Sequence, residues 1–185
     1  MESAVLTLRT AQLELRAASL ALLEAELRGR SELTHALAAE VPGDWPPGEY
    51  DRPALEFFHA QCLALGAAAV GWYGWYVLHA PRGEPPPVLV GAGGYLGPPD
   101  ATGVVEVGYS ILPAWQGRGF ARELVTALVA RALATGRVRR LQAHTTPSNL
   151  ASVRVLERTG FRLTGPGAEP GSIRYEYEAT ASAAV

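Results

Sequence analysis

The chain has 185 residues, of which 48% are hydrophobic, and a formal net charge of −2. This length suits one domain over residues 1–185 that buries about 70% of its unfolded surface, with a frayed tail from about residue 179. The small net charge argues against binding to nucleic acid, and the lack of a long apolar run argues against a membrane span. The single cysteine, Cys62, excludes an internal disulfide. Since no secretion signal is visible either, we expect a cytoplasmic protein.

The first half of the chain predicts one strand and two helices. Residues 13–16 alternate apolar and polar side chains, as strands do. Ser19 is a capping residue, and the leucines after it recur at helical spacing until Gly29. A proline-rich loop at residues 41–50 leads to a second helix at residues 53–65, which begins with a proline.

The second half predicts further strands alternating with helices. Strands are expected at residues 71–79 and 88–95, joined by a proline-rich turn at 81–87, and a longer strand at 104–112. A helix over residues 121–134 then ends before a glycine.

The last elements are a strand at residues 138–145, a helix at 149–159 and two closing strands at 161–163 and 173–178. Strand–helix–strand alternation after an antiparallel meander indicates a mixed sheet, and therefore an α/β domain.

A glycine-spaced helix start follows the strand at residues 104–112. Its sequence is Gln116-Gly-Arg-Gly-Phe-Ala121, after a proline turn. The first N–H groups of a helix have no intrahelical acceptor, and the helix dipole adds partial positive charge there. Gly117 and Gly119 let the backbone approach an anion closely, and Arg118 supplies charge. The stretch therefore predicts a pyrophosphate-binding loop.

Two common nucleotide-binding loops are excluded. A Walker loop requires a lysine, and the chain contains none. A dinucleotide fingerprint requires G-x-G-x-x-G, and the nearest match, which begins at Gly91, has Leu96 in place of the third glycine.

The remaining pattern, Gln116-x-x-Gly119-x-Ala121, resembles the Q/R-x-x-G-x-G/A motif with which the GCN5-related N-acetyltransferase (GNAT) superfamily binds the pyrophosphate of acetyl-coenzyme A. A second segment is similar to the other cofactor segment of the superfamily: Pro147-x-Asn149 opens an N-x-x-S-x-x-x-L-E helix, and Gly-Phe161 follows. The two segments most resemble the branch of ribosomal-protein N-terminal acetyltransferases of the RimJ and RimL type.

The resemblance implies a GNAT-like fold, a mixed and mostly antiparallel twisted sheet of about six to seven strands flanked by about four helices. It implies a wedge between the strands at residues 104–112 and 138–145, where the pantetheine arm lies beside unpaired backbone groups. It also implies acetyl-CoA as co-substrate, no metal, and a monomer or homodimer.

The cofactor residues implied by the resemblance fall into three groups. Backbone groups near the end of the long strand would bond to pantetheine, the loop would hold the phosphates, and the start of the later helix would contact pantetheine and the thiol. The residues are, in this order, Ile111 and Leu112; Gln116, Gly117, Arg118, Gly119, Phe120, Ala121 and Arg122; and Asn149 and Ser152.

Acetyl transfer to an amine requires a proton acceptor, because an aliphatic ammonium is mostly protonated at neutral pH. Glu106 is the first candidate, since it is the only acidic residue on the long strand and relatives often use a glutamate there. The alternative interpretation is that Glu106 is a solvated strand residue or forms a structural ion pair with Arg140 across the sheet. His144 is the second candidate for the base, although a lone histidine at a strand end is more often structural.

The candidate acid is less clearly marked. Many superfamily members carry a tyrosine in the later helix that protonates the departing thiolate, whereas the matching residue here is Leu156. Ser152 or water would take that part. Cys62 lies outside both cofactor segments, so we expect direct attack in a ternary complex rather than an acetyl-enzyme.

Candidates for the acceptor site lie in the proline-rich loop and on the last strand. Asp44 and Trp45 in the proline-rich loop combine a carboxylate with an aromatic ring, which suits a cationic amine. Tyr175 and Tyr177 share a face of the last strand and are further candidates, with ordinary strand packing as the alternative.

The sequence therefore predicts an acetyl-CoA-dependent N-acetyltransferase. A protein N-terminus, an amino acid, a polyamine and an aminoglycoside all remain open as acceptors, as does a longer acyl donor. The alternative from another functional class is a non-catalytic acyl-CoA-binding or sensing domain.

Overall fold

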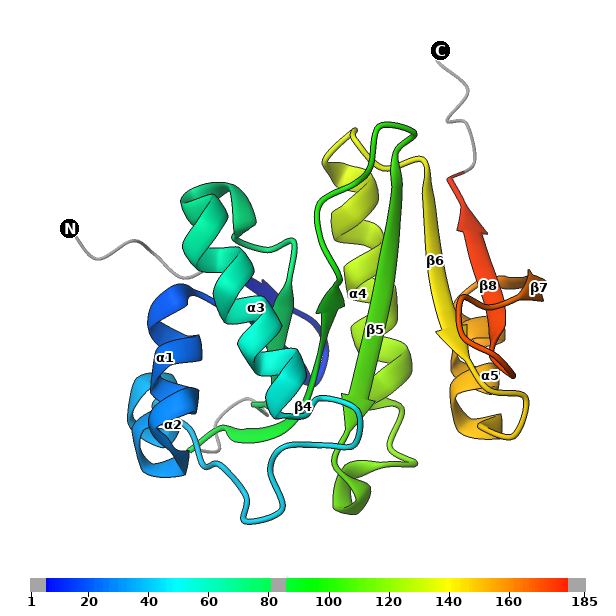
Figure 1. Cartoon of the computed structure of the whole chain (residues 1–185). Coiled ribbons are helices and arrows are strands. Elements are labelled where there is room, and N and C mark those ends of the chain that lie inside the picture. The colour runs from blue at the N-terminus through cyan, green and yellow to red at the C-terminus, as the bar shows by residue number, and fades with distance from the viewer. Residues whose placement is uncertain (1–5, 81–85, 180–185) are drawn as a thin grey trace.

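Eight strands form one sheet in the computed structural model, which describes residues 6–80 and 86–179 (Figure 1). Their order across the sheet is β1-β2-β3-β4-β5-β6-β8-β7. Every pair of neighbours is antiparallel except β5 and β6, which are parallel. The strands are β1 Thr7–Arg9, β2 Leu13–Ala17, β3 Gly74–His79, β4 Val88–Tyr95, β5 Val104–Ile111, β6 Arg140–Thr145, β7 Arg162–Pro166 and β8 Ile173–Glu178.

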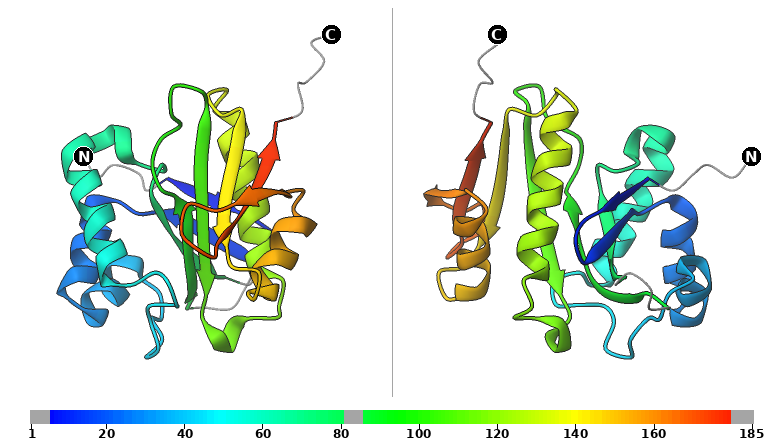
Figure 2. Two further views of the ribbon diagram at one scale, coloured as in Figure 1. Left: turned by 45° about the vertical axis from the view of Figure 1, so that its right-hand side comes forward. Right: turned by 180° about the vertical axis from the view of Figure 1, so that it is seen from behind.

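Helices cover both faces of the sheet (Figure 2). A Cβ atom built on Gly74 would meet Phe58 of α3, whereas one built on Gly93 would meet Leu124 of α4, so these two helices lie on opposite faces. Helices α1 and α2 lie with α3, and α5 lies with α4. The helices are α1 Leu20–Arg28, α2 Arg30–Leu37, α3 Arg52–Leu65, α4 Phe120–Ala134 and α5 Leu150–Arg158, with short 3₁₀ turns at Gly66–Ala69 and Pro113–Trp115.

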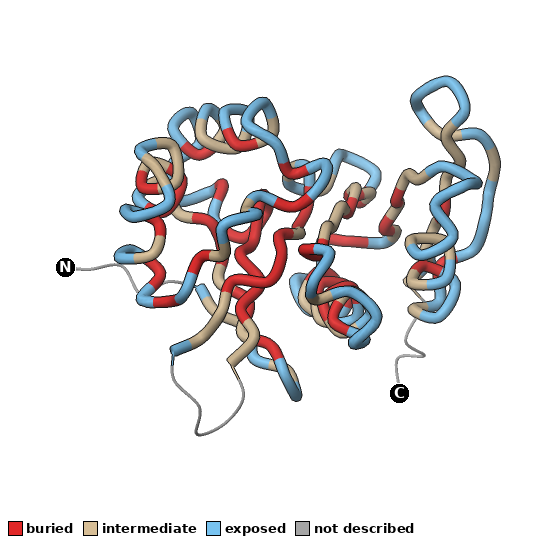
Figure 3. The backbone as a smooth tube through the Cα atoms, turned by 90° about the horizontal axis from the view of Figure 1, so that it is seen from below, coloured by how far each residue is buried: buried red, intermediate tan, exposed pale blue. Residues whose placement is uncertain are grey.

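Side chains cap three of the helices, and the cap at Ser19 is the one that the sequence predicts. Ser19 accepts from the N–H of Leu22 at the start of α1, and Asp51 and Asn149 cap α3 and α5 in the same way. The central strands and the inward faces of the helices are buried, while the outer faces of the helices are exposed (Figure 3). No helix in the described part of the chain is both long and apolar enough to cross a membrane.

The predicted fold class is confirmed, and the predicted numbers of strands and helices are slightly lower than those in the structure. The sequence predicts neither β1, a three-residue edge strand, nor α2. Gly29, with φ of 140°, ends α1 and directly precedes α2, so the glycine that marks one helix end also hides the next helix start. The turn predicted at 81–87 lies mostly outside the described residues, and so does the tail beyond Ala179. Ala179 itself is described, and its N–H donates to Arg139 O.

The strands β5 and β6 pair only at their first residues. Their parallel register runs from Val104 opposite Arg140 to Glu106 opposite Gln142 and then stops, although both strands continue. Beyond that point β6 pairs only with β8, and β5 and β6 diverge towards their C-terminal ends (Figure 1). A wedge therefore opens next to the N-terminal ends of α4 and α5.

Candidate active site

Backbone groups of β5 face the wedge. The N–H of Leu96 donates to Glu106 O and that of Leu112 donates to Val90 O, so the even-numbered residues of β5 bond to β4. In an antiparallel pair the alternate residues point their N–H and C=O groups to the other side. Those of residues 107, 109 and 111 consequently point towards β6, beyond the end of its pairing with β5.

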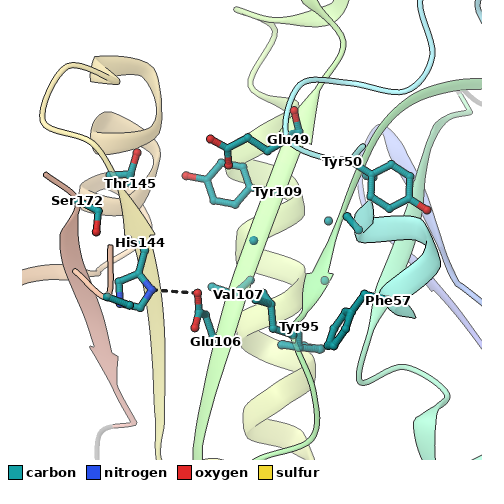
Figure 4. Close-up of a pocket in the computed structure, with 18 of the residues that line it drawn as sticks. Glu49, Tyr50, Phe57, Tyr95, Glu106, Val107, Tyr109, His144, Thr145 and Ser172 are labelled. Atoms are coloured by element: carbon teal, nitrogen blue, oxygen red, sulfur yellow. Dashed lines mark hydrogen bonds and ion pairs between the residues drawn. The ribbon is translucent and has the colours of Figure 1, made fainter. Parts of the chain in front are cut away.

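Glu106 and His144 meet across the wedge. His144 Nδ1 lies 2.9 Å from Glu106 Oε1, and the side chains of His144 and Glu106 are 19% and 30% exposed, so water still reaches both (Figure 4). The predicted ion pair between Glu106 and Arg140 is wrong, because Arg140 pairs with Glu178 at 2.7 Å and with Glu176 at 3.8 Å instead. The first and second candidates for the base thus form one pair.

A pocket of about 460 Å³ lies against this pair on the α3 face of the sheet. Its walls come from β4, β5, the end of β6, the start of α3, the loop at residues 41–50 and the loop before β8 (Figure 4). This volume is within the usual range for a small-molecule site.

The predicted pyrophosphate loop has the backbone conformation that an anion site needs. Gly117 and Gly119 have φ of 75° and 85°, and a Cβ atom on either would meet nothing within 4 Å. Gly119 is the N-cap residue of α4 and no side chain caps that helix, so the first N–H groups, from Phe120 to Arg122, stay available. Ala121 is half-buried beside them.

Two side chains of this loop fold back on the protein. Gln116 Nε2 donates to Ile111 O at 2.9 Å and so holds the turn together. The Arg118 guanidinium lies 4.7 Å from the centroid of the Trp115 ring and donates to Ala114 O. Arg118 is therefore placed by a cation–π contact in this structure.

Ile111 and Leu112 differ in what they offer to pantetheine. The N–H of Leu112 donates to Val90 O, and its C=O accepts from Trp115, so both of its backbone groups are used within the protein. Ile111 belongs to the residues whose backbone points into the wedge, and its C=O already accepts from Gln116 Nε2, so its N–H is the group that it can offer to pantetheine.

Tyr109 is a site residue that the sequence analysis missed. Its hydroxyl lies 3.0 Å from Ser152 Oγ, which connects β5 to the first turn of α5. Burial raises the pKa of Tyr109 to about 12, although the hydrogen bond to Ser152 acts in the opposite direction. The phenol therefore remains protonated at neutral pH. The amide oxygen of Asn149 is occupied in capping Ser152.

Neither Trp45 nor Asp44 belongs to the lining of the pocket. The Trp45 indole N–H donates to Glu26 of α1 at 2.6 Å, and the hydroxyls of Tyr50 and Tyr76 donate to the same carboxylate at 2.9 and 2.7 Å. Burial raises the pKa of the Glu26 carboxyl, while these three hydrogen bonds act to lower it. Trp45 thus holds the loop, whereas Tyr50 and Glu49 line the pocket.

Tyr175 and Tyr177 lie on the face of β8 that carries α5. Tyr175 pairs with Ala143, the neighbour of His144, and therefore points to the opposite side of the sheet from His144. Tyr175 is buried and donates to Glu157 of α5, and Tyr177 packs against Phe161. Both make the strand-packing contacts that the sequence analysis gave as their alternative.

A family profile for the acetyltransferase (GNAT) domain matches residues 6–162. The chain belongs to the GNAT acetyltransferase family. The uncharacterized N-acetyltransferase YjdG of Bacillus subtilis is 28% identical over 162 residues, which cover 88% of this chain and 93% of YjdG.

Solved GNAT acetyltransferases share its fold. An acetyltransferase from Agrobacterium tumefaciens superposes with a TM-score of 0.63 at 23% identity, covering 97% of this chain and 98% of the other. RimL, the ribosomal L7/L12 alpha-N-protein acetyltransferase, in complex with coenzyme A superposes with a TM-score of 0.62 at 21% identity, covering 94% and 98%. The family model over residues 6–162 confirms the family expected from the two sequence segments.

Proposed function

We propose that this acetyltransferase transfers the acetyl group of acetyl-CoA to a primary amine by direct attack in a ternary complex. The observation that carries the proposal is the Glu106–His144 pair, which lies at the wedge beside the free backbone groups of β5. A domain that only bound the cofactor would gain nothing from a carboxylate–imidazole pair at this place.

The cofactor would lie along the wedge. The phosphates would meet the N–H groups at the start of α4, between Gly117 and Arg122, where helix dipole and open glycine positions favour an anion. The pantetheine arm would run past the backbone of Ile111 towards Asn149. Acetyl-CoA supplies the activated acetyl thioester.

The reaction then needs one proton acceptor. The Glu106–His144 pair takes a proton from the acceptor ammonium, which frees the nitrogen lone pair to attack the thioester carbonyl carbon. As the C–N bond forms, the carbonyl oxygen becomes an oxyanion, and an N–H group of β5 that faces the wedge stabilises it. Breaking the C–S bond releases the thiolate, and the nitrogen loses its second proton to the thiolate or to solvent, which leaves the neutral amide and coenzyme A.

The leaving thiolate needs a hydrogen-bond donor. Ser152 is the candidate, and the Tyr109 hydroxyl, 3.0 Å from Ser152 Oγ, orients it and stays protonated because of its raised pKa. This pair would replace the tyrosine that many relatives carry at the position of Leu156.

An assay of free thiol release from acetyl-CoA across a panel of amines, with mass spectrometry of the products, tests the proposal. The expected result is an amine-dependent thiol release that yields the N-acetylated product. Tight binding of coenzyme A without turnover on any amine would instead favour the non-catalytic acyl-CoA-binding domain.

A further inference from the structure

The pocket beside Glu106 has a one-sided charge. Three carboxylates line it, from Glu49, Glu106 and Glu169, and none of the arginines in the described chain does. His144 is the only basic side chain in the lining, and it is already paired with Glu106. Because all basic residues other than histidine are arginines in this sequence, no described cation balances the pocket.

Glu49 has no partner among the described residues. It is exposed at the end of the loop at residues 41–50, and its carboxylate lies beside the pocket at a different position along β5 from Glu106 (Figure 4). Two other carboxylates on this side already have partners: Glu26 accepts three hydrogen bonds and Glu56 pairs with Arg52. A second negative charge is therefore free at a distance from the proton acceptor.

Aromatic rings complete the pocket. Tyr50, Phe57 and Phe58 contribute to its lining, and Phe57 keeps 44% of its surface exposed although it is a large apolar side chain. Faces of aromatic rings attract cations, and they also cover the carbon chain between two charged ends. The wall thus suits an elongated cation better than a neutral polar ligand.

We propose that the acceptor is a small polycationic amine, with one amine at the Glu106–His144 pair and a second, still charged ammonium held by Glu49. This inference rests on the proposed acetyl transfer and narrows its acceptor. Amino acids are disfavoured, because their carboxylate would face three carboxylates of the lining.

Three amines with the same carbon chain test the inference: putrescine, n-butylamine and γ-aminobutyrate, which end in an ammonium, a methyl group and a carboxylate. We expect kcat/KM for putrescine to exceed that for n-butylamine by about two- to fivefold, since one partly exposed ion pair contributes on this scale. The value for γ-aminobutyrate should be the lowest. The advantage of putrescine should shrink with added salt.

The variant Glu49→Gln should reduce the ratio between putrescine and n-butylamine, and adding Glu169→Gln should reduce it further. Glu32→Gln removes an exposed carboxylate on α2, away from the pocket, and should leave the ratio unchanged. Equal efficiency of the three amines, or a ratio indifferent to Glu49, would overturn the inference. So would a clear preference for an uncharged peptide N-terminus.

Calorimetric titration of the same amines into the coenzyme A complex gives a readout that does not depend on turnover. Tighter binding of putrescine than of n-butylamine, lost in Glu49→Gln, supports the charge selectivity even if no amine is acetylated. In that case the proposed transfer fails while the binding preference stands. Acetylation of all amines without preference would leave the transfer intact and refute the preference.

Discussion

Leu156 is fully buried, so the position at which many relatives carry an acid tyrosine holds a core side chain here. Tyr109 reaches the same helix from β5 instead and contacts Ser152. The sequence gives no sign of this contact, because the two residues are far apart in the chain and only the register of β5 brings them together. The motif marks Ser152, and the register of β5 adds Tyr109 beside it.

The variant Tyr109→Phe should lower kcat by about 10- to 100-fold, because it removes one hydrogen bond to a group that stabilises developing charge. Ser152→Ala should have a similar effect, and the double variant should be little worse than either single one. Steady-state kinetics at saturating acetyl-CoA measures this. Independent, multiplying effects would show that the two hydroxyls do not act together.

His144 and Glu106 should act as one unit in accepting the proton rather than contribute independently. We expect His144→Gln to lower turnover, and a variant that also carries Glu106→Gln to lose little more, since each substitution already breaks the same pair. The affinity for coenzyme A, measured by calorimetry, is the control and should not change. Full activity of His144→Gln would return this histidine to the structural role that is common for lone strand-end histidines.

Helix α1 holds the loop at residues 41–50 in place through the Glu26 carboxylate. Replacing Glu26 by alanine leaves the buried donors of Trp45, Tyr50 and Tyr76 without their acceptor. We expect the free energy of unfolding to fall by about 2–4 kcal/mol in urea denaturation. Because Tyr50 lines the pocket, the KM for the amine should rise while that for acetyl-CoA stays nearly constant.

A control on the same helix is Glu24→Ala. The Glu24 side chain is 46% exposed and lies 4.0 Å from His59, so its removal should change neither quantity much. Equal losses in both variants would mean that helix α1, not the three-donor contact of Glu26, determines the stability.

A substitution at the start of α4 tests whether the first N–H groups of this helix bind coenzyme A. A side chain at Gly119 meets nothing in the protein itself, yet it would occupy the space above the first N–H groups of the helix. We expect Gly119→Val to lower the affinity for coenzyme A at least tenfold in calorimetry, by blocking the anion and by straining a residue with φ of 85°.

Gly136 separates these two causes. It also has positive φ, 67°, with nothing within 4 Å of a built Cβ atom, but it follows the other end of α4. Gly136→Val should therefore cause comparable strain and leave coenzyme A binding intact. Equal loss of affinity in both variants would argue that strain alone is responsible.

For the whole molecule, local patterns predicted most elements but not their assembly. Caps at Ser19 and Asn149 and the alternation in β2 are local signals, and the structure has those elements. The wedge was available only through the family resemblance, because it depends on where the pairing of β5 with β6 stops. The same holds for the contact between Glu106 and His144, which lie on separate strands.

The wall of the pocket beside Glu106 is the part of the site that the sequence predicts least well. Composition marked the loop at residues 41–50, but it could not tell that Trp45 turns to Glu26 while Glu49 borders the pocket. Likewise, Tyr175 and Tyr177 share a face by alternation, and only pairing with β6 determines that this face belongs to α5. Which side of a sheet a loop or strand serves is a property of the assembled fold.

The most direct measurement of the central claim is turnover of Glu106→Gln and of the unchanged enzyme at saturating acetyl-CoA, from about pH 6 to about pH 9. We expect Glu106→Gln to lower turnover by about 10²- to 10⁴-fold near neutral pH, the range usual for a positioned base, with coenzyme A affinity unchanged. The deficit should shrink as pH rises, because more of the acceptor amine is then already deprotonated. Equal turnover of the two proteins across this range would contradict the assignment of Glu106 as the proton acceptor.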